Sequence, residues 1–288
     1  MKIGKIMDNV PLKNLTSYKL SGIASKLIFP SNVPELIELM KYIRKNHLKY
    51  KVIGSGSNLI FDGDYNGILI KLDKLDHLTI KNCEITVEAG YLLKKLALKA
   101  CRLGLTGLEF ATGIPGTVGG ACSNNSGAYN SDMGYIVKSL KVLTPSLEIK
   151  IMENKELDYH YRTSFFEKNP EYIILEANIQ LKKGNKQEIL EIVEDRKKRR
   201  IASQPLEYPS AGSVFRNPNN NYAGKLIEDI GYKGKQKNDA MVSEKHANFI
   251  INKGNASGRD IIELINEIKE KVKQTYDIDL YLEQEIVK

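Results

Sequence analysis

Glycine and hydroxyl side chains gather in two segments of this sequence that could wrap a phosphate group. The first is Gly54-Ser55-Gly56-Ser57-Asn58, which directly follows a short apolar run. Glycine lets the backbone approach an anion and adopt φ > 0, and successive backbone N–H groups form anion-binding concavities. The segment fits neither the GxGxxG fingerprint nor a Walker A loop. Taken alone, it is better explained as a plain tight turn.

The second segment is Gly113-Ile114-Pro115-Gly116-Thr117-Val118-Gly119-Gly120, and a polar cluster from Ser123 to Tyr129 follows it. Four glycines with apolar residues among them indicate backbone packed against a large flat ligand. The two phosphate-type loops are roughly 60 residues apart, outside any Rossmann pattern. Together they favour a dinucleotide bound between two subdomains.

Composition excludes several classes of protein. The 288 residues suffice for about two domains, and 42% hydrophobic with 27% charged residues is ordinary for a globular protein. No run of about 18 apolar residues exists, which argues against a membrane span. The N-terminus (Met1-Lys2-Ile3-Gly4-Lys5) has no apolar signal core, so we do not expect a secreted protein.

Cysteine and histidine do not form ligand patterns. Cys83, Cys101 and Cys122 make no CxxC pair, and we expect buried or semi-buried free thiols. The four histidines show no HExxH or paired ligand spacing, so no metal site is expected.

The net charge of +8 needs its own explanation, and its densest part is Arg196-Lys197-Lys198-Arg199-Arg200. The run continues a helical pattern and carries Glu194→Lys198 and Asp195→Arg199 pairs at i,i+4. A solvated helix face explains it best, with a phosphate-bearing small ligand as the alternative. Nucleic acid is disfavoured as a partner.

Periodicity predicts a mixed set of helices and strands that must position these loops. We expect helices over 33–48, 92–103, 186–202 and 222–230, and a further helix capped by Ser257. Strands are expected over 51–53, 59–61, 68–70, 84–88, 136–143, 148–152, 172–181 and 248–252, with a terminal strand starting near Asp279. The glycine-rich stretch 104–134 keeps apolar residues and should be ordered. The class is α+β, with a domain boundary near 195–205.

Six motifs follow one another along the chain: GSGSNL, EFATGIPGTVGG, YRTSFF (161–166), PSAGSVFRNP (209–218), AGKLIEDIG (223–231) and HANFIIN (246–252). In this order they resemble the UDP-N-acetylenolpyruvoylglucosamine reductases (the MurB family), in the shorter, second subclass. The resemblance runs from Thr16 to Glu285. It implies the FAD-binding fold of the vanillyl-alcohol-oxidase/MurB type, followed by a smaller α+β domain for a UDP-sugar. The FAD-binding region would span 1–195, as subdomains of about 1–75 and 76–195, and the UDP-sugar domain 196–288.

The resemblance implies non-covalent FAD as cofactor and NADPH as co-substrate. The substrate would be UDP-N-acetyl-3-O-(1-carboxyvinyl)-glucosamine, reduced to UDP-N-acetylmuramate for peptidoglycan. A cytoplasmic monomer without nucleic-acid or membrane partners is expected. The alternative is another FAD-dependent oxidase or dehydrogenase of the same fold, which often tethers flavin through His or Cys. No histidine lies between 78 and 159, although Cys101 and Cys122 do.

Three residues match the catalytic positions of the family. Ser213 matches the proton donor, and Arg162 matches the arginine that polarises the substrate carboxylate. The second polarising group is a glutamate in a pattern like L-E-P-E-V, which matches Glu285 in Leu282-Glu283-Gln284-Glu285-Ile286. Glu283 is the competing choice.

The implied binding residues are assigned from the same motifs. Those for the cofactor are Gly54, Ser55, Gly56, Ser57, Asn58, Gly113, Ile114, Pro115, Gly116, Gly119, Gly120, Asn125 and Tyr129. Those for the substrate are Asn217, Lys225 and His246. The sequence departs from the family pattern at Ser21, where glycine is usual, and at Asn124-Asn125, either of which could face the flavin.

Overall fold

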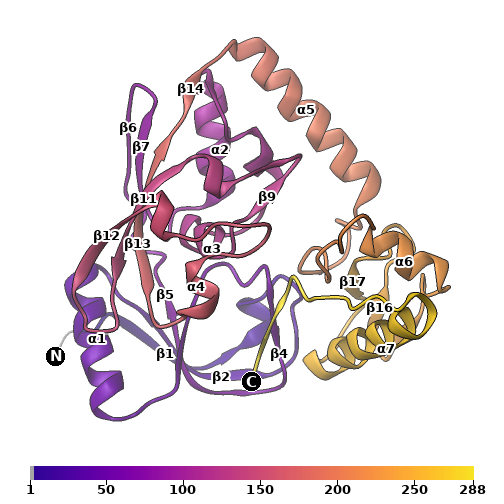
Figure 1. The fold of residues 1–288 in the computed structure, drawn as a ribbon. Coiled ribbons are helices and arrows are strands. Elements are labelled where there is room, and N and C mark those ends of the chain that lie inside the picture. Colours follow the sequence, from indigo (N-terminus) through magenta and orange to yellow (C-terminus); the bar gives the residue numbers. More distant parts are fainter. Residues whose placement is uncertain (1–2) are drawn as a thin grey trace. The chain divides into compact units, whose positions relative to one another are not determined.

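The computed structural model describes residues 3–288 and folds them into two compact units (Figure 1). The first unit contains the described chain up to Met7, together with Leu27–Gly54 and Ile68–Lys198. The second unit contains Asp8–Lys26, Ser55–Gly67 and Arg199–Lys288. Each unit has its own buried apolar core.

A five-stranded antiparallel sheet lies in the core of the first unit. Its order is β12-β11-β13-β7-β6. The strands are β6 (Leu78–Lys81), β7 (Glu84–Glu88), β11 (Val137–Leu143), β12 (Ile149–Glu153) and β13 (Ile173–Gln180). Leu140, Ala177 and Ile179 are fully buried. Four of these strands were predicted from the sequence, β13 with clear alternation of polarity, and the predictions are confirmed to within one residue at each end.

Two amphipathic helices pack their apolar faces into the same core. In α1 (Val33–Lys45), the side chain of Asn32 accepts a hydrogen bond from Glu35 N and so begins the helix. In α2 (Leu93–Arg102), Leu93, Leu96 and Ala97 are completely buried. Both predicted helices are confirmed.

The stretch 104–134 is ordered, as predicted. It contains β8 (Leu105–Thr106), a 3₁₀ turn (Glu109–Gly113), α3 (Val118–Ser123), β9 (Gly127–Ala128), β10 (Ser131–Asp132) and a second 3₁₀ turn (Met133–Tyr135). Strand β14 (Lys182–Lys183) pairs with β8. The short helix α4 is Phe165–Lys168, and a 3₁₀ turn (Asn154–Glu156) follows β12.

A four-stranded sheet has the order β1-β2-β5-β3. Its strands are β1 (Lys5–Pro11), β2 (Ile23–Phe29), β3 (Tyr50–Ile53) and β5 (Tyr65–Lys71), and a 3₁₀ turn (Leu12–Asn14) follows β1. Strands β3 and β5 are parallel, with Val52 opposite Ile70. The sequence interpretation found β3 and part of β5 but neither β1 nor β2.

The second unit is built on two helices and short strands. Strands β15 (Gln236–Lys237), β16 (Ala240–Val242) and β17 (Ile250–Asn252) form an antiparallel sheet. Helix α6 is Ala223–Asp229, and α7 (Gly258–Tyr276) begins with a capping box between Ser257 and Asp260. The buried face of α7 carries Ile261, Leu264, Ile265, Ile268 and Val272. Both helices, and Ser257 as the cap, are confirmed.

The terminal strand begins later than predicted. Strand β18 (Glu285–Val287) pairs in parallel with β4 (Leu59–Phe61), whereas the expected start was near Asp279. The intervening residues bond to another segment: Phe215 and Leu282 form an isolated antiparallel bridge, and Arg216 N donates to Tyr281 O at 2.9 Å. The change of partner explains the shorter strand.

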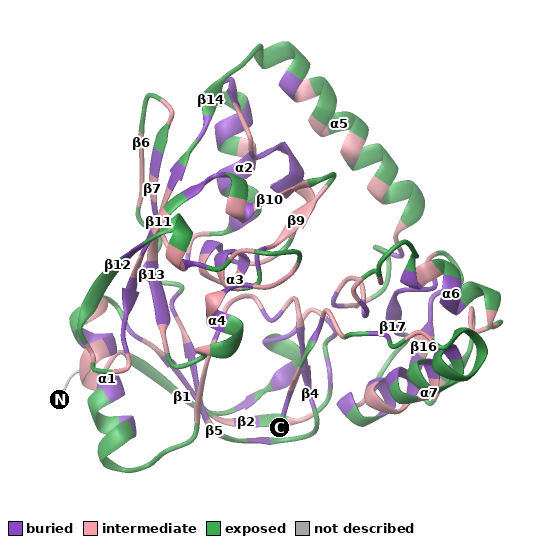
Figure 2. Ribbon diagram, in the orientation of Figure 1, coloured by how far each residue is buried: buried purple, intermediate pink, exposed green. Residues whose placement is uncertain are grey.

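The basic run lies on a long, mostly exposed helix, α5 (Lys186–Ser203), as Figure 2 shows. Lys197 pairs with Glu194 at 3.5 Å, on the solvent side. Arg196 instead lies over the ring of Tyr129, with 4.5 Å between Cζ and the ring centroid. The predicted helical pattern for these residues is confirmed.

The three cysteines are free thiols, as expected: Cys101 and Cys122 are buried and Cys83 is partly buried. Burial raises the pKa of both the Cys101 and the Cys122 thiols to about 12, so neither is a thiolate at neutral pH. Among the described residues, no helix has the length and apolar character to cross a lipid bilayer. Within residues 3–288, His, Cys, Asp and Glu side chains form no group of three that could hold a metal ion.

Candidate functional site

The two glycine-rich loops meet within the first unit. Gly54 follows β3, and a Cβ added there would lie only 2.6 Å from Thr117 Oγ1. Thr117 begins α3, where its hydroxyl accepts a hydrogen bond from Gly120 N at 3.4 Å. A side chain at position 54 would therefore displace Thr117, the residue that caps helix α3. Glycine at 54 keeps the two loops in contact.

In the second unit, the rest of the first loop packs tightly against the chain from Leu15 to Ser17. Gly56 has φ +64°, and a Cβ there would collide with Leu15 O. Ser17 N donates to Gly56 O at 3.1 Å. The Ser17 hydroxyl is buried and has no hydrogen-bond partner among the described residues. An unsatisfied buried hydroxyl costs free energy, and a phosphate oxygen would satisfy it, so these residues fit an anionic group.

In the second loop, internal packing explains only some of the glycines. Gly119 N donates to Ala89 O at 2.9 Å, and a Cβ on Gly119 would lie 2.8 Å from Ala89 Cβ. Gly116 has φ +125°. Around Gly120, by contrast, the one described atom within 4 Å of an added Cβ, outside the adjacent residues and the helix's own backbone, is Thr117 Oγ1, at 3.5 Å. The protein itself leaves room at Gly120, which is consistent with a ligand that approaches the backbone there.

Arg162 sits at the corner of a tight hairpin in the first unit. His160 and Thr163 exchange backbone hydrogen bonds at 3.1 and 3.2 Å, which closes the turn around Tyr161 and Arg162. Arg162 has φ +58°, a conformation that glycine or asparagine normally occupies in such turns. Its Nη2 donates to Gly127 O at 2.5 Å. A partly buried arginine held in a strained conformation points to a functional constraint.

Asn125 supports this hairpin and is almost completely buried. Its Nδ2 donates to His160 O at 2.7 Å, and its Oδ1 accepts from Gly134 N at 2.9 Å. Both ends of the amide are thus bonded to the protein, while Asn124 is exposed.

Tyr129 contacts helix α5 in two ways. Its hydroxyl donates to Arg196 O at 3.3 Å, and its ring lies against the Arg196 guanidinium.

Ser213 lies in an extended segment of the second unit that is bonded on both edges. Val214 N donates to Asn248 O at 2.9 Å, and Glu283 N donates to Val214 O at 2.9 Å. The buried Asn248 side chain accepts from Phe215 N at 3.0 Å and donates to Phe215 O at 2.8 Å. The Ser213 hydroxyl makes no hydrogen bond within the described chain and is partly exposed. The backbone is fixed while the hydroxyl stays available.

The sequence interpretation missed Asn248, although it singled out the motif HANFIIN. The motif was assigned to substrate through His246, whereas in the structure Asn248 holds the backbone on either side of Phe215. The Asn248 amide bonds to the backbone of Phe215 as a neighbouring strand would, and such a contact produces no motif with a recognisable spacing. The one available signal was a polar residue placed directly before an apolar strand.

The glutamates at the chain's end lie beside the first loop. Asn58 Nδ2 donates to Glu283 O at 2.9 Å, and Glu285 N donates to Asn58 O at 2.9 Å. Glu285 is exposed at the start of β18, whereas the Glu283 carboxylate lies 3.7 Å from Arg216 Nε, each side chain about three-quarters buried or more. The two glutamates thus differ in environment: the Glu285 side chain is exposed, and the Glu283 carboxylate faces a protein cation.

The three predicted substrate residues converge on the first turn of α6. Asn217 Oδ1 accepts from Ala223 N at 3.1 Å. A Cβ on Gly224 would lie 3.3 Å from His246 Cε1, and Lys225 follows directly. Burial is the main cause that lowers the pKa of His246, so this imidazole is neutral at pH 7. The exposed Lys225 pairs with Asp229 at 2.5 Å, which raises the pKa of its ammonium group.

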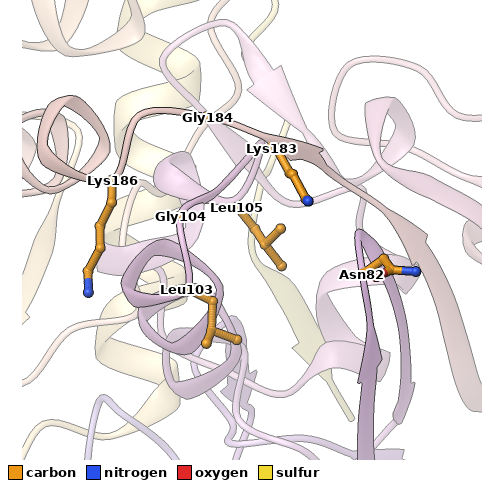
Figure 3. Close-up of a pocket in the computed structure, with 7 residues that line it drawn as sticks. All are labelled: Asn82, Leu103, Gly104, Leu105, Lys183, Gly184 and Lys186. Atoms are coloured by element: carbon orange, nitrogen blue, oxygen red, sulfur yellow. The ribbon is translucent and has the colours of Figure 1, made fainter.

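A separate hollow of about 380 Å³ lies in the first unit (Figure 3). It is lined by Asn82, Leu103, Gly104, Leu105, Lys183, Gly184 and Lys186, none of which is a predicted site residue.

Two family models match the chain, one in its N-terminal half and one at its C-terminal end. An FAD binding domain matches residues 24–151, which contain both glycine-rich loops. A UDP-N-acetylenolpyruvoylglucosamine reductase C-terminal domain matches residues 204–287, which contain Ser213 and Glu285.

Relatives with the same name cover the chain from end to end. UDP-N-acetylenolpyruvoylglucosamine reductase of Clostridium kluyveri is 43% identical over 100% of this chain and 96% of its own length. The reductase of Bacillus subtilis is 42% identical over 99% of this chain and 95% of its own length. The crystal structure of the Thermus caldophilus enzyme superposes with a TM-score of 0.85 at 32% identity, covering 99% of both chains.

The fold and the two loops define the class: an α+β flavoprotein with the predicted FAD-binding fold and a smaller C-terminal α+β part. Within that class, the chain belongs to the UDP-N-acetylenolpyruvoylglucosamine reductase family. The resemblance seen in the sequence is confirmed, and so is FAD as the cofactor.

Proposed function

We propose that the chain reduces UDP-N-acetyl-3-O-(1-carboxyvinyl)-glucosamine to UDP-N-acetylmuramate with NADPH, as a cytoplasmic enzyme of peptidoglycan synthesis. The observation that carries the proposal is the full-length likeness to reductases of this name at 42–43% identity. The local geometry supports it, because the Ser213 hydroxyl is unengaged on a fixed backbone segment. The enzyme would act as a monomer.

The reaction needs a hydride, charge stabilisation and a proton. FAD held by the two loops would supply the hydride chemistry between NADPH and the terminal carbon of the enol ether. Negative charge then develops at the neighbouring carbon and spreads into the substrate carboxylate. Arg162 would stabilise this charge, because a planar guanidinium matches a carboxylate in two hydrogen bonds. Glu285 would polarise the same carboxylate, and Ser213 would donate the proton to the carbon.

The residues proposed to hold FAD are those of the two glycine-rich loops, 54–58 and 113–120. The buried, unpartnered Ser17 hydroxyl and the open space at Gly120 support this assignment. Asn125 would contribute to the site indirectly, by supporting the Arg162 hairpin, because its side-chain NH₂ and C=O groups are both bonded within the protein. The division into an FAD region (1–195) and a UDP-sugar domain (196–288) stays a prediction. Asn217, Lys225 and His246, gathered at α6, are the proposed substrate contacts.

Gly120→Ala tests the second loop. The added methyl would have only ordinary contact with Thr117 Oγ1, and alanine is the better helix former, so the apoprotein should be as stable as the wild type or more stable. FAD affinity should nevertheless fall about tenfold or more, because the cofactor's approach to the backbone is blocked. Calorimetric titration of apoprotein with FAD measures this.

The matched variant is Gly119→Ala, whose methyl would clash with Ala89 and should lower apoprotein stability. If Gly120→Ala binds FAD as tightly as the wild type, the cofactor does not contact this glycine.

The overall activity is tested with purified protein, NADPH and the enolpyruvyl UDP-sugar. We expect NADPH oxidation that depends on the sugar, with a product carrying two more hydrogens than the substrate. NADPH oxidation without change in the sugar would reject the proposal. Acid precipitation should release the yellow cofactor, since the thiols of Cys101 and Cys122 are buried and protonated. A yellow pellet would instead support the other oxidases of this fold.

A further inference from the structure

A buried glutamine lies between the two glutamates at the end of the chain. Gln284 is 3% exposed, and its carboxamide is fully hydrogen-bonded within the second unit. Its Nε2 donates to Ala211 O at 3.1 Å and to Gly212 O at 3.2 Å. Its Oε1 accepts from the Tyr18 hydroxyl at 3.0 Å. The two carbonyl groups that it binds immediately precede Ser213.

The turn at Gly212 depends on hydrogen bonds for its conformation. Gly212 has φ +77°, and among the described residues other than its two chain neighbours, no atom lies within 4 Å of the position that its Cβ would occupy. Neighbouring side chains therefore do not hold this residue by packing. The bonds from Gln284 hold its carbonyl group and that of Ala211, and Val214 is held from the other side by Asn248.

Tyr18 lies at the other end of this chain of bonds and is held by burial and hydrogen bonds. Its side chain is fully buried, and burial raises the pKa of its hydroxyl well above the ordinary value, so it stays a donor at all working pH values. Tyr18 O accepts from Asn252 Nδ2 at 2.9 Å. The preceding residue, Ser17, bonds to Gly56 of the first glycine-rich loop. A continuous set of contacts thus runs from that loop through Tyr18 and Gln284 to the Ser213 turn.

We propose that Tyr18 and Gln284 are positioning residues, which fix the turn at Gly212 and so aim the Ser213 hydroxyl for proton delivery. The inference rests on the proposed function, because it takes Ser213 as the proton donor. Because both side chains are buried, they would act through the turn and not by contact with the reacting atoms. A small error in the direction of a donor slows proton transfer steeply, since productive geometry is narrow.

The test separates the two half-reactions in Tyr18→Phe, Gln284→Met and the double variant. Stopped-flow absorbance follows flavin reduction by NADPH and, separately, flavin reoxidation by the enolpyruvyl substrate. Each single variant should slow reoxidation by about tenfold or more and leave reduction within about twofold. Gln274→Met, on the exposed face of α7, is the matched control and should change neither rate.

The double variant distinguishes positioning from stability. Each single change leaves a buried polar group without its partner and should lower the melting temperature. The double change removes both partners of the Tyr18–Gln284 bond and should recover part of that loss, while reoxidation stays slow. If reoxidation recovers together with melting temperature, or if both half-reactions slow equally, the two residues only stabilise the fold and the inference is wrong.

Ser213→Ala, measured alongside, separates this inference from the proposed function. If Ser213→Ala reoxidises at the wild-type rate, the proton-donor assignment fails, whatever the Gln284 variants do. If Ser213→Ala is slow and both Tyr18→Phe and Gln284→Met are unaffected, the assignment stands and the positioning inference alone fails. Should Gln284→Met fail to fold, Tyr18→Phe, which removes one hydroxyl, gives the same decision.

Discussion

Ser213→Ala should reoxidise its flavin about 10² to 10⁴-fold more slowly than the wild type, the range expected for a lost general acid. Flavin reduction by NADPH should stay nearly normal, because no substrate carbon is protonated in that step. Stopped-flow absorbance measures both rates in one preparation. The backbone around Ser213 is held by Asn248 and Gln284 rather than by the serine's own hydroxyl, so the substitution should leave the fold intact.

Ser203→Ala, in the last turn of the exposed helix α5, is the matched control, and its two rates should equal those of the wild type. Equal slowing of reduction and reoxidation in Ser213→Ala would show a structural role for the residue. A wild-type rate of flavin reoxidation in Ser213→Ala would show that another group, or water, donates the proton.

Local patterns in the sequence predicted most of the elements that have an apolar face. The five predicted helices are present, and in α1, α2 and α7 the buried positions repeat with the helical period. In α5 the one buried residue is Ile189. Strand β1 was missed for a physical reason. β1 carries Asp8 and Asn9, with φ +51° at Asn9, and only Val10 of the strand is buried, so no alternation of polarity exists to be recognised.

The site could be predicted only as far as its motifs reach. Ser213, Arg162 and Glu285 were assigned by resemblance, and their surroundings were not accessible from the sequence. Tyr18 and Gln284 are 266 residues apart, and a single hydrogen bond between such positions leaves no mark on local composition. The strained backbone at Arg162 was also not predictable, because a positive φ is uncommon in residues other than glycine and an arginine gives no sign of it in the sequence.

Replacing Arg162 by glycine or by alanine should abolish most substrate reduction and yet give proteins of different stability. Both variants lack the guanidinium, so both should reoxidise flavin about 10² to 10³-fold more slowly, the range for a lost charge-stabilising donor. Both also lose the bond to Gly127 O. They differ at the backbone: alanine keeps the strain of φ +58°, whereas glycine adopts that conformation freely.

The glycine variant should therefore be more stable than the alanine variant by about 1 kcal/mol, the usual cost of a left-handed residue. Urea unfolding of the two apoproteins measures the difference directly, and the shared loss of the guanidinium cancels between them. A glycine variant no more stable than the alanine variant would show that the hairpin holds position 162 without strain. Normal reoxidation in both variants would instead remove Arg162 from the charge-stabilising role. The combination of strain and lost activity would show that this protein keeps an arginine at a glycine-type position for chemistry, at a cost in stability.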